Sequence, residues 1–204
     1  IGNEYYAKKN KTYGLSTMRT KHLDISAKEI MFEFIGKKGK MHQISITDKA
    51  LRKLVMQCEE IPGWELFQYY DENGKHHSID SGMVNDYIHE VSGDLFSAKD
   101  FRTWAASKLF FEFLYEAGMP TTKKDLKNTI LSAYDKAAEG LGNTRSVCRE
   151  YYVHPILPQK FEDGSIEFYL KKLNHEEDIA SIPHFSATET VLLQMLSEYQ
   201  IVLD

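Results

Sequence analysis

The chain has 204 residues, 42% of them hydrophobic and 27% charged, with a formal net charge of −5. This length and composition suffice for one large domain or two small ones with a hydrophobic core. The two cysteines are not spaced as in zinc-binding or redox motifs, and their small number argues against a secreted protein held together by disulfides. No apolar run is long enough for a membrane span or a signal peptide. We therefore expect a cytoplasmic protein, and the acidic balance by itself does not indicate a nucleic-acid partner.

The first predicted elements are three strands, rich in β-branched and aromatic residues, at Leu23–Ser26, Ile30–Ile35 and His42–Ile46. The segment Gly36–Lys40 between the last two is expected to form a hairpin tip, with its glycines supplying the positive φ angles of a tight turn. From Asp48 the hydrophobic period becomes helical. The face predicted to be buried carries Leu51, Leu54, Val55 and Cys58.

Four further helices are predicted from their starting residues, Ser81, Ser97, Thr122 and Ser186. The second should run to Ala117, and the third should end at Gly142. Loops are expected at residues 61–65, 71–79 and 154–166, where proline, glycine and asparagine cluster. The prediction is a single α+β domain over residues 1–204, with an antiparallel β-hairpin region at about 22–47 and a helical body at 48–204.

Three segments combine cationic, polar and nucleophilic side chains at the start of an element or in a turn. They are Gly36–Lys40, Lys99–Ala105 and Leu141–Pro155. In this order they resemble the active-site motifs of type IB DNA topoisomerases of the poxviral and bacterial kind, which are relatives of the tyrosine recombinases. Further parts of the chain also resemble that family, at Gly14–His22, Glu65–Tyr69 and Asp80–Asn85. The resemblance implies the topoisomerase IB fold and cleavage of one DNA strand through a tyrosine.

The resemblance also assigns roles to individual residues. The family's hairpin lysine, a general acid, falls on Lys37, and its helix-borne phosphate ligand falls on Arg102. The family places a histidine, or in bacterial members an asparagine, nine residues before the nucleophile. Asn143 occupies that position, so the nucleophile is expected to be Tyr152 rather than Tyr151.

Further cations are candidate ligands of DNA phosphates. Lys99 lies one helical turn before Arg102 and matches a basic position of the family. Arg145 departs from the family, which usually has proline after Asn-Thr, and an added cation there should strengthen the phosphate contact. Arg149 and Lys21 complete the predicted set.

The chemistry explains the need for these residue types. A free tyrosine has a pKa near 10, so the attacking phenolate needs positive charge nearby. A planar guanidinium suits the equatorial oxygens of the transition state, an amide N–H adds a neutral donor, and a lysine can protonate the leaving 5′ oxygen. The resemblance implies no metal, no nucleotide cofactor, double-stranded DNA as the partner, and a monomer.

Two alternatives remain open. A tyrosine recombinase would share the nucleophile and the cations, although recombinases usually have histidine where this chain has Lys99. A DNA-binding module of the same fold could have lost cleavage. Each candidate residue taken singly also fits an ordinary role, as a solvated turn lysine, a surface arginine, a helix cap or a packing tyrosine.

Two parts of the family pattern are expected to be absent from this chain. The first catalytic arginine of the family sits one position before the stretch that matches Ile1–Glu4. The family's N-terminal β-rich domain, which completes the clamp around DNA, is not matched either. We therefore expect the chain to be the catalytic domain of a longer protein.

Overall fold

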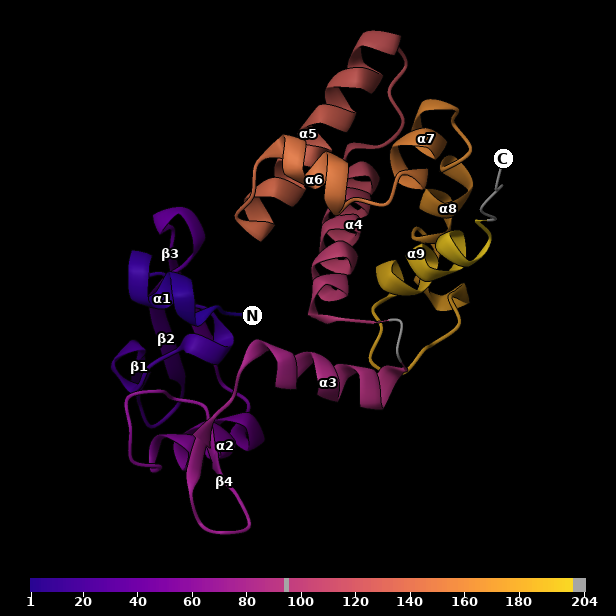
Figure 1. The fold of residues 1–204 in the computed structure, drawn as a ribbon. Coiled ribbons are helices and arrows are strands. Elements are labelled where there is room, and N and C mark those ends of the chain that lie inside the picture. The colour runs from indigo at the N-terminus through magenta and orange to yellow at the C-terminus, as the bar shows by residue number, and fades with distance from the viewer. Residues whose placement is uncertain (94–95, 200–204) are drawn as a thin grey trace. The chain divides into compact units, whose positions relative to one another are not determined.

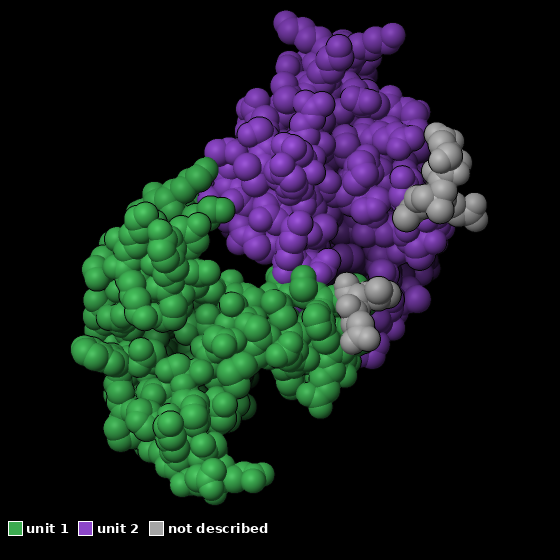
Figure 2. All heavy atoms as spheres, in the orientation of Figure 1, with its two compact units in different colours: residues 1–98 green, residues 99–204 purple. Residues whose placement is uncertain are grey.

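The computed structural model describes residues 1–93 and 96–199 and divides the chain into two compact units, Ile1–Ala98 and Lys99–Asp204 (Figure 2). Each unit has its own cluster of buried hydrophobic side chains. The sequence carries no signal for this boundary, because a helix begins there in place of a proline- or glycine-rich linker. The single catalytic domain over residues 1–204 stays a prediction, and residues 94–95 and 200–204 of that range lie outside the described residues.

The first unit contains a three-stranded antiparallel sheet in the order β1-β2-β3. Its strands are β1 Leu23–Ile25, β2 Ile30–Ile35 and β3 Met41–Ile46, which confirms the three predicted strands to within a residue at their ends. β2 alternates, with Ile30, Phe32 and Phe34 buried and the intervening side chains more exposed. This alternation gives the sheet one face toward the core of the unit.

The turn between β2 and β3 is a short 3-10 segment at Lys37–Gly39. Gly39 has a positive φ of 75°, as predicted, but the second positive φ, 63°, belongs to Lys38. Gly36 has an ordinary negative φ of −92° and is needed for a different reason. A Cβ atom at residue 36 would lie 2.5 Å from Nε2 of His42, so the glycine allows that imidazole to pack against the turn.

The other helices of the first unit are α1 Glu4–Asn10, α2 Lys49–Glu59 and α3 Ser81–Ser92 (Figure 1). α2 begins after Asp48 as predicted, but Leu51 and Leu54 of its predicted buried face are 51% and 57% exposed, and only Val55 is buried. α3 is capped by Asp80 instead of Ser81, because the Asp80 carboxylate accepts a hydrogen bond from the Met83 amide.

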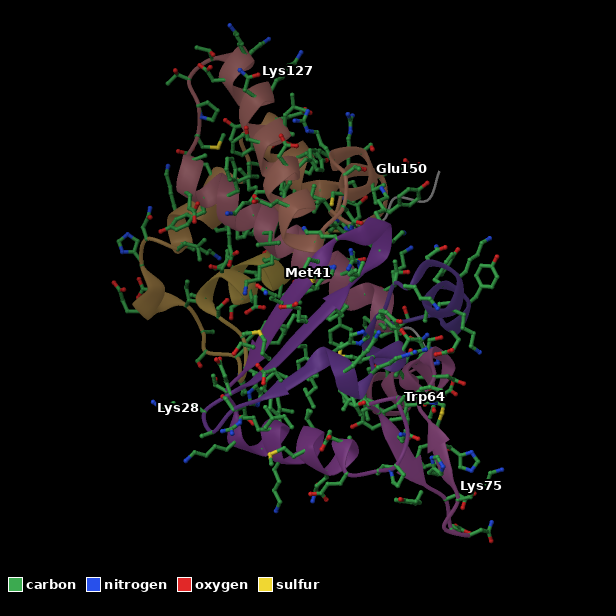
Figure 3. All side chains as sticks on the ribbon, turned by 90° about the vertical axis from the view of Figure 1, so that its left-hand side faces the viewer. Lys28, Met41, Trp64, Lys75, Lys127 and Glu150 are labelled. Atoms are coloured by element: carbon green, nitrogen blue, oxygen red, sulfur yellow. The ribbon has the colours of Figure 1, made fainter. Side chains whose placement is uncertain are left out.

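A second hairpin, formed by β4 Gln68–Tyr70 and β5 His76–Ser78, corrects the predicted loop at 71–79, which holds only the turn (Figure 3, near the labels Trp64 and Lys75). Two of its three cross-strand pairs are aromatic, with Tyr69 stacked on His77 and Tyr70 edge-on to His76. Such pairs stabilise two strands without a long hydrophobic run, so the segment lacks the apolar pattern that predicts a strand.

The second unit is helical throughout its described part. α4 Ala98–Ala117 and α5 Lys123–Leu141 confirm the two long predicted helices, and α9 Ala187–Ser197 confirms the last one. Shorter helices lie between them, at α6 Arg145–Tyr151, α7 Ile156–Glu162 and α8 Glu167–Lys172. In Figure 1, α5 and α6 lie on one side of α4, and α7, α8 and α9 lie on the other. The fold is therefore α+β, as predicted.

The predicted loop at 154–166 is wrong, because most of it is helix α7. Pro155 directly precedes that helix, at a position where proline is well tolerated since its missing N–H would have no helical partner. Ile156, Leu157 and Phe161 are buried in the core of the second unit. These side chains are buried by neighbouring helices, and the short hydrophobic pattern of residues 156–162 does not indicate that packing. None of the helices within the described ranges is long and apolar enough to cross a membrane.

Candidate active site

Arg102 lies near the start of α4 and joins two later parts of the chain. Its Cζ atom lies 5.3 Å from the ring centroid of Tyr152. Its Nη2 atom donates a hydrogen bond of 2.9 Å to the carbonyl oxygen of Leu141, the last residue of α5. A guanidinium over an aromatic face is attracted by the negative face of the ring. The contact therefore brings together the predicted phosphate ligand and the predicted nucleophile.

Tyr152 directly follows α6 and is half-buried. Its amide donates to the carbonyl oxygen of Cys148 at 3.2 Å, and the next residue, Val153, donates to the same oxygen at 2.9 Å and is buried. These bonds fix the chain where the helix ends. The segment is also tied to α4, because the Ser107 Oγ atom accepts a hydrogen bond of 3.0 Å from the amide of His154.

Tyr151, the neighbouring tyrosine, has a different environment. It is the last residue of α6 and is 55% exposed. Glu150, which is labelled in Figure 3, hydrogen-bonds its hydroxyl and raises its pKa, which opposes formation of a phenolate. The position over Arg102 thus distinguishes Tyr152 from Tyr151 independently of sequence spacing.

Asn143 follows Gly142, which ends α5 in the left-handed conformation with a φ of 66°. The Asn143 amide donates to the carbonyl oxygen of Ala138 at 2.8 Å, which completes the C-terminal cap of α5. Its side-chain Nδ2 atom is buried and has no hydrogen-bond partner within the described part of the chain. The ordinary role considered for Asn143, a helix N-cap, belongs to Thr144, whose Oγ1 accepts from Val147 at 3.4 Å.

A buried amide N–H without a partner is costly, and such groups in native proteins call for an explanation. Here the unsatisfied donor lies two residues after the Leu141 carbonyl that Arg102 binds. A phosphate oxygen is a suitable acceptor for both side chains. The geometry thus fits an anion-binding role for Arg102 and Asn143.

Cys148 is the other potential nucleophile near Tyr152. It is fully buried, and burial raises the pKa of its thiol despite the opposing charge of Arg102. A thiol with a raised pKa stays protonated at neutral pH and is inert. Cys148 therefore serves as packing, which leaves the phenol of Tyr152 as the nucleophile candidate.

The predicted phosphate ligands of the second unit lie in different surroundings. Lys99 and Arg149 are exposed, on α4 and α6. Arg145, the first residue of α6, binds the carboxylate of Asp135 with two parallel hydrogen bonds, one of them 2.6 Å from Nε to Oδ1. The sequence gives no signal that residue 135 of α5 faces residue 145.

Lys37 and Lys21 belong to the first unit, where both are exposed. Lys37 lies on the turn between β2 and β3. The Nζ atom of Lys21 lies 5.7 Å from the ring centroid of Tyr13, whose ring also packs against the buried His22 with a centroid separation of 4.3 Å and a tilt of 59°. Their contribution to catalysis or DNA binding stays a prediction from the resemblance.

One cluster in the described residues has the atoms to bind a metal ion: His175, Glu177 and Asp178, whose ligand atoms lie within 4.8 Å of one another. All three side chains are exposed, and none is among the candidate site residues. Exposed acidic groups of this kind are common without an ion, so the cluster carries no catalytic assignment.

Comparison with known proteins agrees with this geometry. A family model described as the catalytic core of eukaryotic DNA topoisomerase I matches residues 1–177. The chain belongs to this family. DNA topoisomerase 1B of Acanthamoeba polyphaga mimivirus is 31% identical over 183 residues, covering 86% of this chain and 54% of the viral protein. DNA topoisomerase I of monkeypox virus is 24% identical over 191 residues, covering 89% of this chain and 55% of its own length.

The family match confirms the resemblance to type IB topoisomerases and gives no support to the tyrosine recombinase alternative. The chain spans about half the length of the curated relatives it matches. These relatives are viral, so they agree with the poxviral part of the predicted resemblance and do not support the bacterial part.

Proposed function

We propose that the chain is the catalytic domain of a type IB DNA topoisomerase, which relaxes supercoiled double-stranded DNA by transient cleavage of one strand. The observation that carries the proposal is the contact of Arg102 with the ring of Tyr152, next to the segment that holds the unsatisfied Asn143 amide. A nucleophile, a guanidinium and a neutral donor are the groups that a phosphodiester transesterification requires.

In the proposed cleavage step, the Tyr152 phenol loses its proton to water and its oxygen attacks the scissile phosphorus. The new P–O bond forms as the bond to the 5′ oxygen breaks, which leaves a 3′-phosphotyrosyl link. Arg102 would bind two non-bridging oxygens with its planar fork, and the Asn143 Nδ2 group would donate to one of them. These donors would meet the charge that develops on phosphorus in the transition state.

The leaving 5′ oxygen needs a proton, since an alkoxide is a strong base. The resemblance assigns that proton to Lys37. Lys99, Arg149 and Lys21 are proposed to bind neighbouring phosphates, where they would position the duplex without reading its sequence.

After cleavage, the free 5′ end rotates about the intact strand and its hydroxyl attacks the phosphotyrosyl phosphorus. This regenerates both the DNA bond and the tyrosine. One phosphate ester is exchanged for another, so neither ATP nor a metal ion is needed in the proposed mechanism. We further propose that the protein acts as a monomer and is located with DNA in the cytoplasm. Its proposed similarity to bacterial members of the family lies in the asparagine at position 143.

The test is covalent trapping on a suicide duplex, whose short cut end diffuses away and prevents resealing. The chain should form a denaturation-resistant protein–DNA adduct without ATP or divalent ions. Tyr152→Phe should form none, whereas Tyr151→Phe, a matched control one residue away, should form as much as the unsubstituted chain. An adduct with Tyr152→Phe, or none with the unsubstituted chain, would contradict the proposal.

A further inference from the structure

The turn that presents Asn143 is short and lies between two helices. It consists of residues 142–144 and is named here the α5–α6 corner. On one side the corner is fixed by the C-terminal cap of α5, and on the other by the Thr144 cap of α6. Each cap orders its own helix end, but neither fixes the angle between the two helices.

Asp135 and Arg145 connect the helices on either side of this corner. Asp135 lies within α5, and Arg145 is the first residue of α6, two residues after Asn143. Two parallel hydrogen bonds from a planar guanidinium to one carboxylate fix direction as well as distance. The pair therefore holds the start of α6 against the side of α5.

The Asn143 side chain depends on this arrangement. Its buried Nδ2 atom has no hydrogen-bond partner within residues 1–93 and 96–199, so no hydrogen bond from that atom holds the amide in place. The direction of the amide is thus inherited from the backbone of the corner. A small rotation of α6 would move the amide relative to Arg102, and misplacement of a catalytic donor costs rate.

The same contact weakens the case for Arg145 as a phosphate ligand. Its Nε and Nη2 atoms are both bound to Asp135, and the carboxylate neutralises its charge. The guanidinium hydrogen bonds hold the pKa of Asp135 below its usual range, so the pair is charged on both sides at neutral pH.

We propose that the Asp135–Arg145 pair positions Asn143 for catalysis by fixing the α5–α6 corner, and that Arg145 acts through Asn143 and not on DNA phosphate. Arg145 and Asp135 are thus positioning residues. This inference rests on the proposed function, because it concerns the rate of the same cleavage step.

The test is a mutant cycle read by single-turnover adduct formation at saturating DNA. Arg145→Ala and Asp135→Ala should each slow cleavage roughly three- to thirtyfold, and the double variant should be no slower than either. The exchanged pair, Asp135→Arg with Arg145→Asp, should recover part of the rate. In an Asn143→Ala background, Arg145→Ala should cost less than twofold, because the residue it positions is gone. A purely structural defect would instead slow both backgrounds equally.

DNA binding provides the second measurement. Losing one phosphate contact lowers the slope of log affinity against log salt by about one. Arg145→Ala should leave this slope unchanged. The proposal would be overturned if Arg145→Ala reduced this slope by about one while Asp135→Ala bound DNA more tightly. Arg145 would then be a phosphate ligand whose charge Asp135 neutralises. An unchanged cleavage rate in Arg145→Ala would also overturn it while leaving the topoisomerase function intact. If the unsubstituted chain formed no adduct, the function itself would fail and this inference with it.

Discussion

The guanidinium of Arg102 lies over the ring of Tyr152, with 5.3 Å between Cζ and the ring centroid, while the same side chain donates to the carbonyl oxygen of Leu141. One residue of α4 thus contacts both ends of the segment from the close of α5 to the residue after α6. The contact orders the phenol and the phosphate ligand relative to each other before DNA is bound.

Arg102→Ala should slow adduct formation roughly 10²–10³-fold, the usual cost of removing one transition-state donor. Arg102→Lys should recover little, because an ammonium lacks the planar fork and cannot contact two phosphate oxygens in the same way. Lys127→Ala, which removes an exposed cation of α5, is the control and should cleave normally. The measurement is the single-turnover rate of adduct formation by each variant. A fully active Arg102→Lys variant would exclude bidentate phosphate binding by Arg102.

Asn143→Ala should slow cleavage roughly 10²-fold by removing the neutral donor. The same change should not lower the free energy of unfolding, because the Nδ2 atom has no hydrogen bond to lose among the described residues and its burial is unfavourable. Asn143→His, which keeps a donor, should retain most of the rate. Urea unfolding alongside cleavage rates checks both parts, and a marked loss of stability would indicate a structural role.

Lys37→Ala should slow cleavage of ordinary DNA roughly 10²–10⁴-fold, as expected for loss of a general acid. A substrate with sulfur in place of the bridging 5′ oxygen has a thiolate leaving group that needs no proton, so it should be cleaved at a nearly normal rate. Lys38→Ala, at the neighbouring turn residue, should behave like the unsubstituted chain on both substrates. An equal defect of Lys37→Ala on both substrates would assign the lysine to phosphate binding.

Glu189 stabilises the second unit in a pH-dependent way. Its carboxylate accepts from Ser186, at the start of α9, and from Trp104 Nε1 of α4, which lowers its pKa from 4.5 to about 2. A folded pKa below the unfolded one stabilises the fold fully above pH 4.5, and this stabilisation is lost as the pH falls toward 2.

Glu189→Gln should therefore lower the free energy of unfolding at pH 7 by about 1–2 kcal/mol. The difference from the unsubstituted chain should shrink between pH 4.5 and pH 2, where the carboxylate becomes protonated. Glu167→Gln removes an exposed pair with Lys171 and should change the stability by less than about 0.5 kcal/mol. Urea titrations across this pH range would refute the account if the Glu189→Gln difference stayed constant.

The sequence predicts the elements whose pattern is local. Ile30–Ile35 alternates along one strand, and Thr122 and Gly142 mark the two ends of α5, so these were found with their bounds. Helix α7 lies in the predicted loop at 154–166, which Asp163 and Gly164 mark in the sequence, and only packing against other helices buries Phe161.

The candidate site divides in the same way. The resemblance to type IB topoisomerases assigns Arg102, Asn143 and Tyr152 to the site, and the structure brings Arg102 to Tyr152. Neither the Leu141 carbonyl bound by Arg102 nor the pairing of Asp135 with Arg145 could be predicted. Both contacts arise from the way separate helices pack against one another, and no local sequence pattern predicts them.

The central claim is that Tyr152 becomes covalently attached to DNA, and peptide mapping of the trapped adduct tests it most directly. After protease and nuclease digestion, mass spectrometry should find the nucleotide remnant on Tyr152, in the peptide that also contains Tyr151, with fragment ions that separate the two positions. Attachment at Tyr152 through a 3′ phosphate is the predicted result. A remnant on Tyr151, on Cys148 or at a 5′ phosphate would contradict the account.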